Sequence, residues 1–211
     1  DPEKAKRILS SGPAETIRTT LSLPVQANGT TLAFFQLHNF DREDAYPLPL
    51  LSGAARRVPG EDGGGALTFD GASEPLAFAD APGLRFGPDE SFTIEFRVRP
   101  ATEDTRARQT ILRKHDPATG SGWDFRLNTK GRLAFYARQN RAVAVNFLAP
   151  GNALGQWHHV AFVRDAAEGM VRYYVDNKLL HERDAPRGEN PFDQPGPLCI
   201  GGGSAPDDRF E

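Results

Sequence analysis

One segment of the sequence carries an acid at a position where a sugar-cleaving strand would need one. Residues 92–99 read Phe-Thr-Ile-Glu-Phe-Arg-Val-Arg, and Glu95 is their only carboxylate. A retaining glycosidase needs two carboxylates about 5 Å apart, one as nucleophile and one as general acid. Thr93 and Arg97 occupy the positions two residues away. The pattern therefore indicates a non-catalytic strand on which Glu95 pairs with Arg97 or with an arginine across the strand.

The remaining reactive side chains have unsuitable spacing or neighbours. His158 and His159 are adjacent, and adjacent side chains on a strand point to opposite faces, so the pair cannot hold one metal ion. Cys199 is the only cysteine, which excludes a disulfide within the chain. Its neighbours Leu198 and Ile200 are typical of a buried position rather than of a nucleophile. We expect no enzyme activity, no metal site among these residues and no required cofactor.

Outward-facing polar and aromatic side chains form a candidate binding surface. Sugars are bound by flat aromatic rings together with polar groups that meet their hydroxyls. Trp123 and Trp157 fall in strands that we expect to face the core, whereas Tyr136 alternates with Leu133 and Phe135 and should face outward. The candidate ligand-binding residues, expected on one sheet face, are Glu95, Arg97, Asp124, Arg126, Arg132 and Tyr136. They would form either a salt-bridged solvated face or an arginine-bearing groove for an acidic or hydroxylated glycan.

Composition limits the class of protein. The 211 residues include 25 Lys and Arg against 28 Asp and Glu, giving a net charge of −3. Such a balance argues against an electrostatically driven nucleic-acid binder. No apolar run approaches the roughly 18 residues that span a bilayer, so we expect no membrane insertion. The 38% hydrophobic content indicates a folded chain. Because the sequence starts at Asp1 without a methionine, we expect a piece excised from a longer protein.

The elements that must position these side chains are short strands. Residues 1–12 favour a short helix or linker, ended by Gly12-Pro13. Turns are expected at residues 28–29, 70–71, 129–131 and 176–177, and residues 41–65 should be mostly loop. Strands are expected at residues 17–23, 31–38, 48–51, 66–69, 92–99, 110–113, 123–127, 132–136, 142–147, 157–164, 170–175, 178–182 and 198–200. This pattern predicts an all-β fold, a two-sheet antiparallel sandwich or jelly roll with a short N-terminal helix or linker.

Eight short motifs in a fixed order suggest a family. They are ALTFDG at 66–71, FTIEFRV at 92–98, ILRK at 111–114, GWDFRL at 122–127, GRLAF at 131–135, GQWHHVAFV at 155–163, YVDNK at 174–178 and LCIGG at 198–202. Together they resemble the laminin-G-like, concanavalin A-like lectin/glucanase jelly roll of secreted bacterial proteins. The resemblance covers residues 30–211.

The resemblance implies a domain plan. Residues 1–29 would be an N-terminal extension with a short helix, a linker and a candidate extra strand, and residues 30–211 the jelly roll, opening with a strand at 32–40. The family closes with a strand beside its first one, yet the sequence ends at Glu211, where that strand would begin. We therefore hypothesise that the chain is truncated, or that a partner chain fills the open edge.

The resemblance also implies a function. We expect a non-catalytic recognition module that binds a glycan or polysaccharide, within a larger exported protein that is secreted, periplasmic or on the cell surface. Two alternatives stay open: a protein-interaction or structural module packed against a neighbouring domain, and an atypical glycosidase of the same fold. Relatives often bind structural calcium through loop oxygens. The candidate carboxylates here are Asp41, Asp44, Asp70, Asp207 and Asp208.

Overall fold

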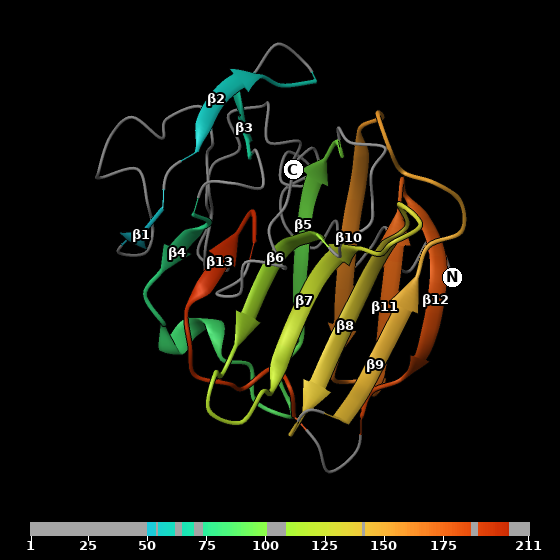
Figure 1. The fold of residues 1–211 in the computed structure, drawn as a ribbon. Helices are drawn as coiled ribbons and strands as arrows, with labels where there is room; N and C mark the ends of the chain where they lie inside the picture. Colours follow the sequence, from blue (N-terminus) through green and yellow to red (C-terminus); the bar gives the residue numbers. More distant parts are fainter. Residues whose placement is uncertain are drawn as a thin grey trace.

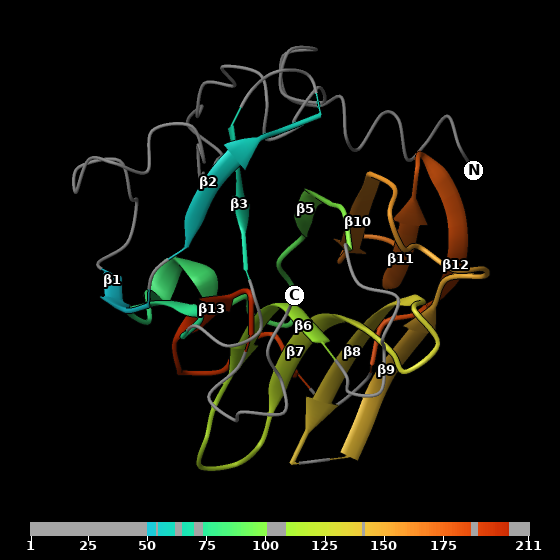
Figure 2. The same ribbon diagram turned by 45° about the horizontal axis from the view of Figure 1, so that its top comes forward.

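Two antiparallel sheets stack against each other, and a small hairpin sheet lies at one end (Figures 1 and 2). The structure is a computed structural model that describes residues 50–53, 55–61, 65–69, 74–100, 109–140, 142–186 and 190–202. The expected helix at 1–12, the strands at 17–23 and 31–38, and the turns at 28–29 and 70–71 lie outside these residues. The described part of the chain confirms the all-β sandwich.

The larger sheet has seven strands in the order β1-β4-β13-β6-β7-β8-β9. All its strand pairs are antiparallel. Its strands are β1 (Leu50–Ser52), β4 (Leu76–Phe78), β13 (Leu198–Ile200), β6 (Gln109–His115), β7 (Gly122–Leu127), β8 (Leu133–Gln139) and β9 (Ala142–Leu148).

The smaller sheet has four strands in the order β12-β11-β10-β5. They are β5 (Phe92–Val98), β10 (His158–Asp165), β11 (Met170–Val175) and β12 (Lys178–Asp184). The hairpin sheet pairs β2 (Arg56–Pro59) with β3 (Gly65–Thr68). One 3-10 turn, Pro82–Leu84, is the helical element of the described residues.

The core lies between the two large sheets and is rich in phenylalanine. Phe135 of β8 stacks on Phe162 of β10 with 4.0 Å between ring centroids, and Phe96 of β5 meets the edge of Phe125 of β7 at 4.9 Å. These pairs cross from one sheet to the other, so they hold the two layers together. Burying each such ring contributes about 1.5–3 kcal/mol.

Some strand predictions were incomplete. Residues 41–65 were expected to hold one short strand at 48–51, but the structure places β1 at 50–52 and β2 at 56–59. The three-residue β4 was missed altogether, because a segment this short shows no periodicity. It is a strand because β1 and β13 pair with it on either side.

The turn expected at residues 176–177 is confirmed. Asp176 and Asn177 both have positive φ, 52° and 62°, which a two-residue hairpin of right-handed twist requires. The Asp176 carboxylate accepts a hydrogen bond from the His159 backbone N–H at 3.0 Å and contacts His158 Nδ1 at 2.8 Å. This carboxylate links the β11–β12 turn to the start of β10.

A buried lysine ties three segments together on the core side of β6. Lys114 is only 1% exposed. Its ammonium donates to Asp80 Oδ1 at 2.5 Å and to the carbonyl oxygens of Gln194 and Gly196 at 3.0 and 2.9 Å. Three acceptors satisfy the three N–H groups of a lysine, so the buried charge is fully matched. The contacts join β6 to the segment before the 3-10 turn and to the loop that leads into β13.

We predict that Lys114→Met destabilises the fold by about 3 kcal/mol, because it leaves the two carbonyls and one side of the Asp80 carboxylate without their partner. Urea unfolding, followed by tryptophan fluorescence, measures the change. The matched control is Lys178→Met at an exposed position of β12, which should change stability by less than about 0.5 kcal/mol. Equal unfolding midpoints for the two variants would contradict this role of Lys114.

Candidate binding site

The candidate site lies on the outer face of the seven-stranded sheet, at β7 and β8. Trp123, Phe125 and Leu127 of β7 belong to the core. The alternate residues Asp124 and Arg126 therefore point away from the core, yet they are only 4% and 5% exposed. The charged side of β7 is thus buried as fully as its apolar side.

Asp124 is the centre of a charged cluster. Its Oδ1 lies 2.6 Å from Arg126 Nε, although that N–H is not aimed for a hydrogen bond, and its Oδ2 accepts from Arg126 Nη2 at 3.2 Å. The same Oδ2 accepts from Arg138 Nη1 at 3.2 Å and lies 3.4 Å from His115 Nε2. Arg113 Nη2 is 3.0 Å from His115 Nδ1. We call these five residues the Asp124 cluster.

The cluster sets the protonation states of its two titratable members. Burial raises the pKa of Asp124, but the hydrogen bond with His115 and the charges of Arg126 and Arg138 outweigh burial, so the pKa lies below its usual value. Burial holds the pKa of His115 below its usual value, and its contact with Asp124 offsets only part of that effect. At neutral pH the cluster therefore contains an ionised aspartate and a neutral histidine.

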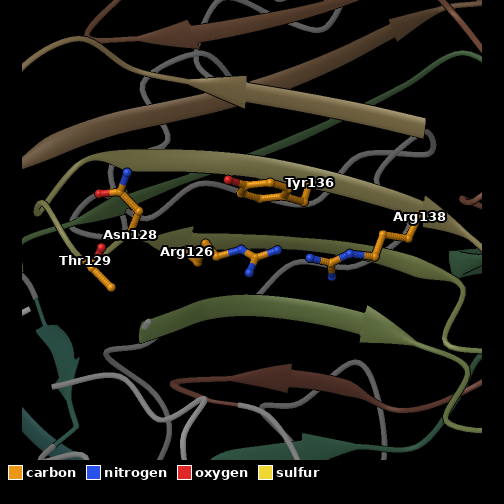
Figure 3. A pocket seen from close by; sticks show the side chains of 5 residues that line it. All are labelled: Arg126, Asn128, Thr129, Tyr136 and Arg138. Carbon is orange, nitrogen blue, oxygen red and sulfur yellow. The ribbon is translucent and has the colours of Figure 1, made fainter. Parts of the chain in front are cut away.

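A pocket opens above the Asp124 cluster. It has a volume of about 220 Å³ and is lined by Arg126, Asn128, Thr129, Tyr136 and Arg138 (Figure 3). The Arg126 guanidinium stacks over the Tyr136 ring, with its carbon 3.8 Å from the ring centroid, and that of Arg138 is 5.5 Å from it. A stacked guanidinium loses little freedom when it binds a ligand, because the ring and Asp124 already hold it.

The β7–β8 hairpin positions the polar end of the pocket. The Asn128 side-chain oxygen accepts hydrogen bonds from the backbone N–H groups of Lys130 and Arg132, at 2.9 and 3.1 Å. These two bonds fix the oxygen toward the turn and leave the side-chain nitrogen as the group that can meet a ligand. Gly131, with a φ of 67°, completes the turn and confirms the turn expected at 129–131.

The structure divides the six candidate residues between two faces, which corrects the prediction of a single face. Glu95 and Arg97 lie on β5 in the four-stranded sheet, so they face away from the pocket on the opposite side of the core. Glu95 Oε2 is 3.5 Å from His159 Nε2, and Arg97 pairs with Glu61. Strand alternation predicts which residues point outward, but both sheets have an outer face, and alternation does not choose between them.

Arg132 also falls outside the pocket. Its Nε donates to the carbonyl oxygen of Ala149 at 2.7 Å, beyond the end of β9. Of the six candidates, Arg126 and Tyr136 line the pocket and Asp124 lies beneath it.

Comparison with known families decides the classification. A profile of the concanavalin A-like lectin/glucanases superfamily matches residues 70–211, more than half of the chain. The chain belongs to this superfamily. The match confirms the resemblance drawn from the eight sequence motifs. No curated protein sequence matches the chain.

Solved structures of the superfamily fold resemble the chain at low sequence identity. The binding domain of Paraclostridial mosquitocidal protein 1 superposes with a TM-score of 0.61 at 13% identity, over 77% of this chain and 42% of that one. The chain therefore spans less than half of that binding domain. The module CBM40 of a Ruminococcus gnavus sialidase, bound to α2,6-sialyllactose, gives a TM-score of 0.48 at 14% identity. The match covers 65% of this chain and 82% of that one. Mouse laminin α1 domains LG4–5 give a TM-score of 0.44 at 16% identity, over 54% of this chain and 28% of that one. The likeness to the mosquitocidal protein, at 13% identity, shows the fold alone.

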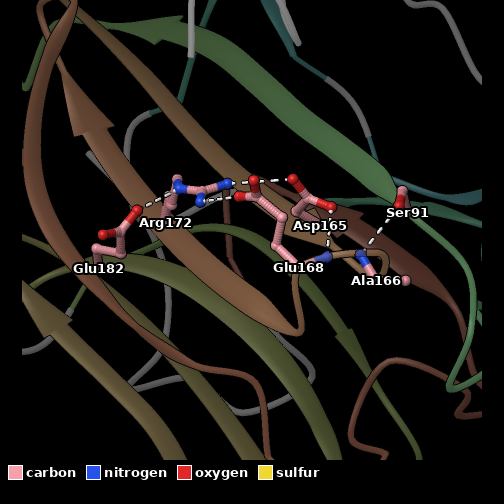
Figure 4. Close-up of polar contacts among 6 residues, drawn as sticks. All are labelled: Ser91, Asp165, Ala166, Glu168, Arg172 and Glu182. Carbon is pink, nitrogen blue, oxygen red and sulfur yellow. Dashed lines mark hydrogen bonds and ion pairs between the residues drawn. The ribbon is translucent and has the colours of Figure 1, made fainter. Parts of the chain in front are cut away.

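A second charged cluster lies on the opposite outer face of this lectin-like sandwich. Arg172 of β11 pairs with three carboxylates, those of Asp165, Glu168 and Glu182 (Figure 4). Burial lowers the pKa of Arg172, but the contacts with Glu182 and Asp165 outweigh burial and hold it above its usual value. Because the arginine occupies the space among the acids, the cluster joins β10, β11 and β12 and offers no vacant position to a ligand.

For metal sites and membrane-spanning helices, the structure reports only on the described residues. The candidate calcium carboxylates, Asp41, Asp44, Asp70, Asp207 and Asp208, lie outside the described residues, so calcium binding stays a prediction. Across residues 50–202, as far as they are described, three or more His, Cys, Asp or Glu side chains never gather as a metal would require. Within the same residues, no helix is long and apolar enough to cross a membrane.

Cys199 is buried, as expected of a lectin-fold strand residue. Burial raises the pKa of its thiol, and the charge of Arg113 offsets this only in part. A thiol that resists ionisation is a poor nucleophile.

Sequence reasoning did not single out three of the pocket's residues. Asn128 and Thr129 belong to a turn, where polar residues are usual and carry no functional signal. Arg138 lies beyond the expected end of its strand, at 136, whereas β8 runs to Gln139. Alternation from Tyr136 does place Arg138 on the outward side, but Arg138 was not included among the candidate binding residues.

We predict that Asp124→Asn destabilises the domain by about 3 kcal/mol at pH 7, because two buried or partly buried arginines, Arg126 and Arg138, lose their counter-charge. A carboxyl whose pKa is lowered by folding stabilises the fold above its unfolded pKa and loses that effect as the pH falls through the folded value. The difference in unfolding free energy between wild type and Asp124→Asn should therefore shrink below about pH 4. Urea unfolding at pH 7 and pH 3 measures it, with the exposed Asp184→Asn as control. A gap independent of pH would contradict this account.

Proposed function

We propose that the chain is a non-catalytic carbohydrate-recognition module, and that the pocket above the Asp124 cluster is its binding site. The observation that carries the proposal is the pocket lining: two guanidinium groups, an amide, a hydroxyl and a tyrosine on one preorganised hairpin. Sugars present many oxygen acceptors in a small volume, and such a lining presents many donors.

The site supports binding rather than glycoside cleavage. Cleavage requires two carboxylates on either side of the scissile bond. None of the five lining residues is an acid. Asp124, which lies beneath them, is occupied by Arg126, Arg138 and His115. Glu95, the acid of the glycosidase alternative, faces the other side of the sandwich on β5.

The surface favours a sugar over a protein partner. A protein interface usually contains a contiguous apolar patch. Among the described residues, the exposed large apolar side chains are Leu51 and Val143, 63% and 56% exposed. They belong to β1 and β9, the two opposite edges of the seven-stranded sheet, and so form no common patch. We further propose that the module belongs to a larger exported protein, because glycan recognition of this kind serves extracellular polysaccharides.

Affinity electrophoresis of the full chain in gels that contain soluble polysaccharides tests the proposal. We expect retardation by at least one polysaccharide, and about tenfold weaker binding for Asn128→Asp. This variant keeps the side-chain oxygen that accepts the two turn hydrogen bonds, but it replaces the donor nitrogen with an acceptor. The control is Asn177→Asp, which adds the same charge in the β11–β12 turn.

Three results would count against the proposal. Migration unchanged by every polysaccharide would refute carbohydrate binding. Equal retardation of the Asn128 and Asn177 variants would place the binding outside this pocket. Release of reducing ends from a bound polysaccharide would show that the chain is an enzyme.

A further inference from the structure

We propose that the pocket selects an anionic sugar residue, whose carboxylate or sulfate group is held by Arg138 together with Arg126. This inference rests on the proposed function and names the class of ligand. It depends on the charge of the face, on the chemistry of the pocket lining and on the fixed geometry of the two arginines.

Among the described residues of the pocket face, the Asp124 cluster is rich in arginine. It contains three arginines and one aspartate, with a neutral histidine. The whole chain carries a net charge of −3. The Arg172 cluster on the opposite face has three carboxylates around one arginine. The arginine-rich composition of the Asp124 cluster favours an acidic ligand at the pocket over one at the acid-rich Arg172 cluster.

The pocket lining offers donors without a carboxylate to accept in return. Arg126 and Arg138 donate only, and the amide nitrogen of Asn128 is a donor. Asp124 lies too deep to bind a ligand, since it is 4% exposed and its oxygens face its cationic partners. The hydroxyl groups of Thr129 and Tyr136 can donate or accept, so the two guanidinium groups, which only donate, set the preference, and a carboxylate or sulfate accepts at every oxygen. The lining is therefore complementary to an anion.

The two arginines are held in place before a ligand arrives. Arg126 is fixed by Asp124 and by stacking on Tyr136, and Arg138 is fixed by the same carboxylate. Figure 3 shows their guanidinium groups facing each other along the sheet between Asn128 and the end of β8. The same Asp124 oxygen accepts from both guanidinium groups, which brings two positive charges close together where one anion can interact with both. Arg138, whose side chain is 23% exposed, is the one that meets solvent.

The size of the pocket limits the ligand to a small group. A volume of about 220 Å³ is less than the roughly 300 Å³ at which pockets for drug-sized molecules begin. One acidic sugar unit, terminal or as a side group of a polymer, fits this space better than a stretch of several rings. Tyr136 orients Arg126, because the Arg126 guanidinium stacks on one face of the tyrosine ring.

The inference is tested with matched pairs of charged and neutral polymers. Polygalacturonate and its fully methyl-esterified form differ in the carboxylate, and dextran sulfate and dextran differ in the sulfate. Affinity electrophoresis of the full chain at constant ionic strength should give at least tenfold tighter binding to one charged member than to its neutral partner. The pair that shows the difference identifies the source of the anion.

Variants assign the effect to Arg138. We expect Arg138→Gln to lose at least about tenfold in affinity for the charged polymer. Arg138→Lys, which keeps the charge but not the planar fork, should lose less. Arg183→Gln removes the same charge from an exposed position of β12, on the other sheet, and should bind as wild type does. Thermal unfolding of each variant checks its fold, and Arg138→Lys decides the question if Arg138→Gln does not fold.

The outcomes separate this inference from the proposed function. Equal binding of charged and neutral polymers would overturn the anion preference and leave carbohydrate recognition standing. A preference for the anion that Arg138→Gln and Arg183→Gln weaken equally would also overturn it, because the effect would then reflect net charge alone. Binding to no polymer, charged or neutral, would refute both.

Discussion

The carboxylate of Asp124 is the charge on which the outer face of the seven-stranded sheet depends. Removing a carboxylate from water costs several kcal/mol unless opposite charges surround it. β7 is in the middle of the sheet, between β6 and β8, so its outward side chains are shielded by those of both neighbours. Arg126 and Arg138 pair with the buried Asp124 carboxylate and neutralise its charge. The pocket is formed by the same arginines, and it therefore exists because the aspartate is buried.

A second buried charge constrains the other side of the same strand pair. Lys114 of β6 faces the core and pairs in register with Trp123, whereas Arg113 faces outward and pairs with Asp124. A slip of one residue would place Lys114 in the outer cluster and leave Asp80 without its partner in the interior. A bulge between Thr110 and Leu112 sets this alternation, since an extra residue changes which side chains face the core. Two oppositely charged groups, one on each face, thus fix the register of β6 and β7.

Sequence alone predicted the strands that alternate regularly and the direction in which their side chains point. β5, β7 and β8 have apolar residues at every second position over six or more residues, and their outward residues were named correctly. Alternation carries no information about which sheet a strand joins, so Glu95 and Arg97 were grouped with residues on the far side of the core. β4 has three residues and depends on its neighbours for its structure. The fully buried position of Lys114 follows from Asp80 and two carbonyls far away in the chain, which no local pattern reveals.

The pocket is contributed entirely by residues between 126 and 138, a single hairpin of β7, its turn and β8. Most binding sites assemble side chains from segments distant in sequence, so a change in one segment must be matched by changes in others. Here the outward positions of one contiguous stretch line the pocket, while the inward positions of the same stretch belong to the core. The lining of this pocket can therefore diverge through substitutions in neighbouring codons, and a transplanted hairpin would carry all five lining residues with it.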